Sequence, residues 1–392
     1  MRFFKVNPRT ENFSNIKKLL VLIEKVIKNL VYFLIVFINF FSFKKKKLIL
    51  DLGIYQDTRF INYLFYSIKS KFFFSYDLDL KIISLIKKVG VVNFLLHCIP
   101  NFRIKNFEKH KFFLKDKKEF NKTAVNIRTK SMIFNTDYFS HIENNNAKEE
   151  KVFMPYYLYP RLYNSKIYKE LDVLRGMSKI FKIVFSGSTH PALYGNFKWY
   201  HADGKKMLNR NQIIDFVSKE FSSEIFYLTS YKDLDSAAKS SKKIIFSLNT
   251  ALAKKTSSKL SNIEHLKLIA QSSFFLTAPG TGMPICHHII EAIKFGTIPI
   301  TSYSELLNPK LDDNLCLTFE SFADLYSVIE KAILMKDEEI LFKKNSLINF
   351  YIKNLSPESF CKQIFFSNFN KEIIACNDHD SALMFLKKNN IT

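Results

Sequence analysis

From residue 47 onward, short apolar runs alternate with amphipathic stretches. In the first half of the chain, this pattern predicts a helix at residues 59–71 and strands at residues 48–52, 72–76, 91–98 and 131–135. Strands that alternate with helices are typical of a parallel, doubly wound sheet. We therefore expect an α/β fold.

The second half repeats the alternation more regularly. Strands are expected at residues 181–185, 224–229, 243–248, 273–277 and 297–301, and helices at residues 211–221, 261–272 and 284–295. From residue 321 on, the pattern predicts helices only. Between the halves, residues 141–151 are polar, and residues 154–163 are rich in Pro and Tyr, which is typical of a hinge.

These patterns divide the chain into four parts. Residues 1–46 form an apolar and basic segment, residues 47–165 and 166–355 form two Rossmann-like domains, and residues 356–392 form a helical tail. A length of 392 residues suits two domains of about 150 residues each. Ligands of open α/β sheets bind at the carboxyl ends of the strands, so we expect the site in a cleft between the two domains.

The N-terminal segment contains an apolar run at residues 30–43, followed by the four lysines of residues 44–47. The run is shorter than the roughly 20 residues that a helix needs to span a bilayer. Three interpretations remain open: a helix lying on the membrane surface, a buried helix of the first domain, and a single span. The lysine block favours the first, because lysines bind anionic headgroups.

The chain carries a formal net charge of +23, which suggests nucleic acid as a partner. Only 8 of its 59 basic residues are Arg, however, and Arg makes the bidentate contacts by which most nucleic-acid readers recognise bases and phosphates. We therefore expect no nucleic-acid partner, although a lysine-rich nucleic-acid-associated protein is the alternative. Five cysteines without a CxxC pair indicate neither a disulfide framework nor a zinc finger, and they favour a reducing compartment.

Glycine is scarce, and seven of the nine glycines lie between residues 176 and 296. In the segment SFFLTAPGTGMPICHHIIEAIKFGTIPI, residues 273–300, a strand leads through Pro279–Gly282 into a helix that we expect to hold Pro284 in its first turn. Such a loop and helix start form an anion site suited to a diphosphate. Along the helix, His287, Glu291 and Lys294 share one face.

The three neighbours Cys286, His287 and His288 suggest a metal site. Adjacent positions on a helix point about 100° apart, so these three cannot all face one ion. We therefore expect no metal. The loop at residues 187–206 is long and contains His190, His201 and the only tryptophan, Trp199. It is expected either to close over a sugar or a base, or to be a plain excursion.

The segment MPICHHIIEAIKFGTIPI resembles the donor-binding motif of GT-B glycosyltransferases of the exostosin-like kind. The segments IFNTDYF, VFMPYYLYP and IVFSGS also resemble a bacterial glycosyltransferase pattern, so the resemblance covers roughly residues 131–335. It implies two Rossmann-like domains that face a cleft. It also implies transfer of a sugar from a nucleotide-sugar donor, without a cofactor or a required metal.

The resemblance further implies that Glu291 holds the ribose and that basic residues neutralise the leaving diphosphate. The donor-binding candidates are Ser186, Gly187, Ser188, Lys206, Arg210, Gly280, Thr281, Gly282, His287 and Glu291. No second Glu stands at the spacing of many retaining enzymes, since Glu305 comes 14 positions after Glu291. An inverting enzyme would need a base, and Asp57 and Asp137 are the candidates, although a turn residue or a cap is the more usual role for each.

These observations lead to one expected function. It is a glycosyltransferase that uses a glycan or a lipid-linked acceptor in the synthesis of surface polysaccharide or lipopolysaccharide. The basic N-terminal segment places it at an anionic membrane surface, in the cytoplasm on the inner face of the membrane. A catalytically inactive scaffold that keeps the GT-B fold is a second alternative.

Overall fold

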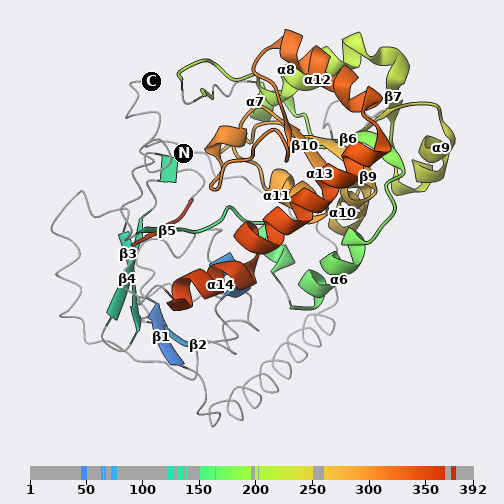
Figure 1. Cartoon of the computed structure of the whole chain (residues 1–392). Helices are drawn as coiled ribbons and strands as arrows, with labels where there is room; N and C mark the ends of the chain where they lie inside the picture. The colour runs from blue at the N-terminus through green and yellow to red at the C-terminus, as the bar shows by residue number, and fades with distance from the viewer. Residues whose placement is uncertain are drawn as a thin grey trace, which may run out of the picture.

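A computed structural model provides the structure of the chain. It describes residues 46–50, 63–64, 66–67, 72–76, 122–127, 130–135, 138–139, 151–163, 165–195, 199–201, 203–249, 260–366 and 372–376. The described strands form two sheets of six strands each, and helices pack around the second sheet (Figure 1). The protein is therefore a mixed α/β structure, as the hydrophobic pattern predicts.

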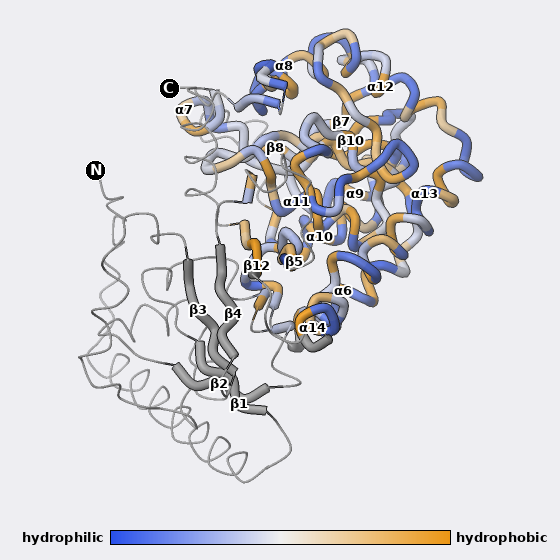
Figure 2. The backbone as a smooth tube through the Cα atoms, turned by 60° about the vertical axis from the view of Figure 1, so that its left-hand side comes forward, coloured by the Kyte–Doolittle hydropathy of each residue, from blue (hydrophilic) through white to orange (hydrophobic). Residues whose placement is uncertain are grey.

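The second sheet is entirely parallel, in the order β11-β10-β9-β6-β8-β7. Its strands in chain order are β6 (Phe181–Ser188), β7 (Ile225–Tyr227), β8 (Ile244–Asn249), β9 (Ser272–Leu276), β10 (Ile298–Thr301) and β11 (Leu317–Thr318). The central strands are apolar and buried, and Phe185, Phe246 and Phe274 are among the largest fully buried side chains. Figure 2 shows the mixed apolar and polar colouring of the surrounding helices. All five strands that the pattern predicts in this half are confirmed.

Helices cover both faces of this sheet. Helix α8 (Arg210–Glu220) packs against α12 (Phe322–Leu334), and α12 also contacts β6 and β11. On the other side, α11 (His287–Lys294) contacts α10 (Asn262–Ala270), α13 (Asp337–Phe350) and β10. Helix α6 (Ser165–Arg175) packs on α10, and the short helix α7 (Pro191–Tyr194) packs on α8. The short helix α9 (Leu234–Lys239) lies between β7 and β8 in the chain.

The strand order places a topological switch point between β6 and β9. From β6 the chain leaves through α8 to the β8-β7 side of the sheet, and from β9 it leaves through α11 to the β10-β11 side. Adjacent parallel strands with connections on opposite sides leave a crevice at their carboxyl ends, which is where ligands bind in such sheets.

The first sheet differs from the prediction. Its order is β2-β1-β3-β4-β12-β5, with strands β1 (Lys46–Leu50), β2 (Phe72–Tyr76), β3 (Lys122–Ile127), β4 (Lys130–Asn135), β5 (Lys151–Phe153) and β12 (Glu372–Ile374). Strand β3 pairs antiparallel with both β1 and β4, so the sheet is mixed rather than parallel. Only two residues separate β3 from β4, and so short a connection permits only an antiparallel pair.

The C-terminal segment also departs from the all-helical expectation. After α14 (Pro357–Phe366), the chain returns to the first sheet, where β12 pairs parallel with β4 and β5. A second contact joins segments far apart in the chain, because the Tyr63 hydroxyl lies 3.2 Å from the backbone oxygens of Leu355 and Ser356. Leu355 ends the π-helical turn Tyr351–Leu355.

The segment expected as a hinge, residues 154–163, is packed rather than exposed. Tyr156, Tyr157, Leu158 and Tyr163 are buried, and the Tyr156 hydroxyl lies 3.3 Å from the backbone oxygen of Ile285. The predicted strand at residues 91–98 and the polar stretch at residues 141–150 lie outside the described residues, as do residues 1–45. Within the described part of the chain, no helix combines the length and apolar character that crossing a membrane requires.

Candidate functional site

Arg210 lies at the switch point between β6 and β9. As the first residue of α8, it extends its guanidinium between the two strand ends: Nη1 donates to the backbone oxygen of Ser188 at 3.1 Å, and Nη2 donates to that of Ala278 at 3.3 Å. The side chain is only 4% exposed. Its cation also lies 4.0 Å from the ring centroid of Tyr194, at cation–π distance. The guanidinium therefore joins the carboxyl ends of the two central strands.

Within the described residues, no carboxylate forms an ion pair with Arg210, and its Nε has no hydrogen-bond acceptor. A buried cation without a counter-charge is costly, because two backbone carbonyls replace only part of its hydration. The Arg210 site is therefore suited to an anion. Helix α8 begins here because Asn209 caps it: the Asn209 side chain accepts from Gln212 N, and Gln212 in turn accepts from Asn209 N.

The loop after β9 lies beside this guanidinium. Gly280 N donates to Pro284 O at 3.2 Å, and a Cβ added at Gly280 would lie 2.8 Å from Met283 O, so the tight turn requires glycine here. The Trp199 indole N–H donates to Gly280 O at 2.9 Å, which anchors the loop of residues 187–206 against the turn.

Helix α11 begins later than predicted. Its first residue is His287 and its N-cap is Cys286, so Pro284 precedes the helix instead of lying in its first turn. The Gly280–Pro284 hydrogen bond holds these residues in a turn, and for that reason the helix starts after them. Thr281 and Gly282 remain partly exposed on this turn.

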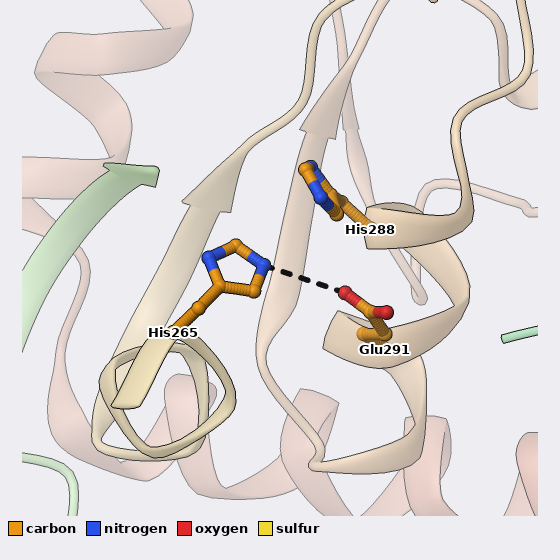
Figure 3. A group of neighbouring side chains, drawn as sticks. All are labelled: His265, His288 and Glu291. Carbon is orange, nitrogen blue, oxygen red and sulfur yellow. Dashed lines mark ion pairs between the residues drawn. The ribbon is translucent and has the colours of Figure 1, made fainter. Parts of the chain in front are cut away.

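Glu291, the expected ribose-binding residue, is buried, with 2% of its surface exposed. Its Oε2 lies 3.4 Å from Nε2 of His265, which comes from α10 (Figure 3). The other nitrogen of His265, Nδ1, lies 2.8 Å from the hydroxyl of Ser186 at the end of β6. Ser186, His265 and Glu291 therefore form a continuous polar chain across the carboxyl edge of the sheet.

His288 completes this cluster. Its ring centroid lies 4.6 Å from that of His265, and the ligand atoms of His265, His288 and Glu291 all lie within 4.8 Å of one another. Burial alone would raise the pKa of Glu291, but His287, His265 and His288 together lower it to about 2. Burial and the neighbouring His265 lower the pKa of His288 to about 3. At neutral pH, the cluster therefore holds a carboxylate beside a neutral His288.

A cavity of about 620 Å³ opens at the ends of β10 and β11. Its lining includes His201, Glu305, Asp312, Asp313 and Glu320. His201 is 5% exposed, its Nδ1 lies 2.9 Å from Oε1 of Glu305, and its Nε2 has no partner among the described residues. A carboxylate on one imidazole nitrogen orients the ring and leaves the other nitrogen to exchange a proton.

The remaining predicted residues lie beside the cluster, on the surface, or outside the described part of the chain. Lys206 is exposed and has no side-chain partner among the described residues. His287 packs against Tyr159, with ring centroids 5.2 Å apart. Lys294 does not share a surface with Glu291 but is buried against Asp172, at 2.8 Å. Asp57 and Asp137, the expected bases, lie outside the described residues.

Two residues of the site were missed by the sequence analysis. His265 and Tyr194 stand in segments without a distinctive motif, and only the packing of α10 on α11 and of α7 on α8 brings them to the site. The capping box of Ser261 and Glu264 was a usable signal for the position of His265. It starts α10 at Asn262 and so places His265 one turn from the carboxyl edge of the sheet.

No protein-family profile matches the chain. No curated protein matches it. Among solved structures, 21 chains match. One is an alpha1,3-fucosyltransferase, 14% identical with a TM-score of 0.25; the match covers 54% of this chain and 52% of that chain. The chain thus spans about half the length of that structure, and a likeness this low bears on neither fold nor activity.

Proposed function

We propose that the protein is a glycosyltransferase that binds the diphosphate of a nucleotide-sugar donor at Arg210. The observation that carries this proposal is the buried guanidinium, which lies at the switch point and has no carboxylate partner within the described residues. A diphosphate supplies the counter-charge that this cation lacks, and charge-assisted bonds to phosphate are strong. The resemblance of residues 131–335 to GT-B enzymes agrees with this assignment and implies the two-domain arrangement.

The polypeptide around Arg210 supports the same ligand. Ser186, Gly187 and Ser188 end β6, and Gly280–Gly282 follow β9, so backbone from both strands flanks the guanidinium. Helix α11 starts beside it, since Cys286, its N-cap, has its sulfur 3.9 Å from Nη2 of Arg210. Phosphates bind well where loop backbone and a helix N-terminus meet a fixed cation.

The acidic cavity suits a sugar, because carboxylates accept hydrogen bonds from hydroxyl groups. In the proposed reaction, the bond between the sugar's anomeric carbon and the phosphate oxygen breaks as an acceptor hydroxyl attacks that carbon. The nucleoside diphosphate leaves with the bonding electrons, and the acceptor proton passes to a base. The His201–Glu305 pair, at 2.9 Å, fits the role of this base.

The finer assignments rest on the sequence. They are a glycan or lipid-linked acceptor, surface polysaccharide or lipopolysaccharide as product, and attachment of residues 1–46 to an anionic membrane surface. A fractionation experiment tests the attachment: deletion of residues 1–44 is expected to release the protein from the membrane fraction, whereas an intact chain that already fractionates as soluble refutes it.

Calorimetric titration of the purified full chain with UDP, GDP, CDP and ADP tests the donor site. We expect one saturable site for one of them, weakened at least tenfold in Arg210→Ala and less in Arg210→Lys, which keeps the charge but loses the planar fork. Lys239→Ala removes an exposed lysine on α9 and serves as the matched control. If no nucleoside diphosphate binds, or if Arg210→Ala binds as well as the wild type, the proposal is wrong.

A turnover screen then separates an enzyme from an inactive scaffold. A chain that binds a nucleoside diphosphate at Arg210 but neither hydrolyses nor transfers from any common nucleotide sugar is a scaffold. A chain that releases the nucleoside diphosphate from its sugar supports the enzyme.

A further inference from the structure

Three side chains that can ligate a metal converge between α10 and α11. His265 comes from α10, and His288 and Glu291, three residues apart on one side of α11, face it (Figure 3). Their ligand atoms lie within 4.8 Å of one another. An ion placed between three such atoms can lie within about 2.8 Å of each of them. Small side-chain rotations then shorten these three distances to the roughly 2.0–2.2 Å of zinc bonds.

Two buried atoms of this cluster lack hydrogen-bond partners among the described residues: Nε2 of His265 and Oε2 of Glu291. They lie 3.4 Å apart, close to the edge of about 3.3 Å that separates two ligands in a tetrahedral zinc site. Buried polar atoms are normally satisfied, because an unmade hydrogen bond there is costly. A cation bound between the two atoms satisfies both at once.

The outer contacts of the cluster also suit a metal site. Nδ1 of His265 lies 2.8 Å from the Ser186 hydroxyl, so an Nδ1–H that donates to Ser186 leaves the lone pair of Nε2 facing Glu291. Metal-binding histidines are usually oriented in this way by a partner on the other nitrogen. The His265 side chain as a whole is 17% exposed, and its Nε2 is buried.

We propose that His265, His288 and Glu291 bind a divalent transition-metal ion of the zinc class. Two imidazole nitrogens and one carboxylate are ligands that zinc accepts, and three protein ligands leave a fourth position for water or for an oxygen of a bound ligand. The helix geometry that keeps Cys286, His287 and His288 from sharing an ion does not apply, because the third ligand comes from another helix. The observations that carry this site do not depend on the proposed glycosyltransferase activity, although Ser186 and Glu291 are also donor-binding candidates.

The experiment uses the full chain, stripped with a chelator and titrated with Zn²⁺ and Co²⁺. We expect one ion per chain, bound with micromolar affinity or tighter, and a visible absorption band of bound Co²⁺ that reports low-coordinate nitrogen and oxygen ligands. Glu291→Gln keeps the side-chain shape. Glu291→Gln and His265→Ala are separate variants, and each is expected to weaken Zn²⁺ binding at least a hundredfold and to remove the band. Ser186→Ala, which removes only the orienting partner, is expected to weaken it about tenfold.

His190→Ala removes a histidine outside the cluster and is expected to leave Zn²⁺ affinity within twofold of the wild type. Circular dichroism checks that each variant is folded, and Glu291→Gln remains informative if His265→Ala is not. Binding of both ions by Glu291→Gln with wild-type affinity overturns the proposal, and so does a wild type that binds neither ion. In that case the contact between His265 and Glu291 only joins α10 to α11.

Discussion

Helix α11 buries two charged side chains, Glu291 and Lys294, under different conditions. In the middle of the helix, Glu291 meets His265 at 3.4 Å, and the two facing atoms have no hydrogen-bond partner among the described residues. Three residues later, Lys294 has an ion pair with Asp172 at 2.8 Å, and its ammonium lies 4.2 Å and 4.9 Å from the ring centroids of Tyr168 and Tyr351. Both side chains are almost completely buried.

The difference separates a structural charge from a candidate functional one. Lys294 meets a carboxylate and two aromatic faces, so its burial is compensated within the protein. Glu291 and His265 contact each other, but their two facing atoms have no hydrogen-bond partner among the described residues. Both atoms are therefore available to a ligand. Mutations at Lys294 should therefore act mainly on stability, and mutations at Glu291 mainly on binding.

The largest expected effect on stability is that of Lys294→Ala. It removes a buried aliphatic stem, two cation–π contacts and the ion pair with Asp172, and should lower the free energy of unfolding by about 2–4 kcal/mol. Chemical denaturation measures this change. Lys331→Ala, an exposed lysine on α12, is the control and should change the free energy of unfolding by less than about 0.5 kcal/mol. If Lys294→Ala loses no more stability than the control, Lys294 does not act as a structural charge, and the comparison with Glu291 fails.

Gly296→Ala should follow, with a loss of about 1–3 kcal/mol in the free energy of unfolding. Gly296 terminates α11 with φ +62°, and a Cβ there would lie 2.8 Å from Cγ of Lys344. Two backbone bonds depend on this conformation, from Gly296 N to Ile293 O at 3.1 Å and from Thr297 N to Ala292 O at 2.9 Å. Thermal or chemical denaturation measures the loss. Gly282→Ala, where nothing lies within 4 Å of an added Cβ, is the control and should be close to neutral.

Glu291→Gln should change the free energy of unfolding by about 1 kcal/mol or less. The variant loses a carboxylate that is only partly compensated but keeps its shape, so the lost attraction to His265 is offset by a smaller cost of burial. The denaturant midpoint measures this. A loss comparable to that of Lys294→Ala would show that the cluster around Glu291 is as structural as Lys294 and would break the comparison.

The smallest effect concerns alkaline pH. Burial lowers the pKa of Lys294 below its usual 10.5, although Asp172 opposes the shift. Between the lowered value and 10.5, the unfolded chain holds this proton more than the folded chain does, so this group makes stability rise with pH. The free energy of unfolding is measured for the wild type and for Lys294→Met across this pH range. The part of its slope against pH that comes from Lys294 should be absent in the variant. Equal slopes would contradict the shift.

The fold of the second half was largely predictable, because local pattern is sufficient there. Strand β6 begins at Phe181, as predicted, and α8 covers the predicted helix to within one residue at each end. The strands of the first sheet were harder to predict from the sequence. Strand β12 is three residues long and is stabilised by pairing with β4 and β5, and strand β3 mixes polar and apolar residues without a clear alternation. Such strands are defined by their neighbours more than by their own residues.

The candidate site was predictable in part. Arg210 and the glycine turn at residues 280–282 were expected near a diphosphate, and the structure places Arg210 between the ends of β6 and β9. The burial of Glu291 and Lys294 was not predicted. Helical spacing places the two on one side of α11, but it does not reveal that α10 and α6 cover that side and bury both.

The amino-acid sequence by itself determined the alternation of strands and helices, the turn at Gly280 and the end of α11 at Gly296, because each depends on residues close together in the chain. Only the tertiary structure decided that His265 meets Glu291, that Arg210 lies between two strand ends, and that Lys294 is enclosed by Tyr168 and Tyr351. These contacts join residues that are 22 or more positions apart in the chain. Periodicity along the chain describes which side of an element is apolar, and it does not specify which element packs against that side.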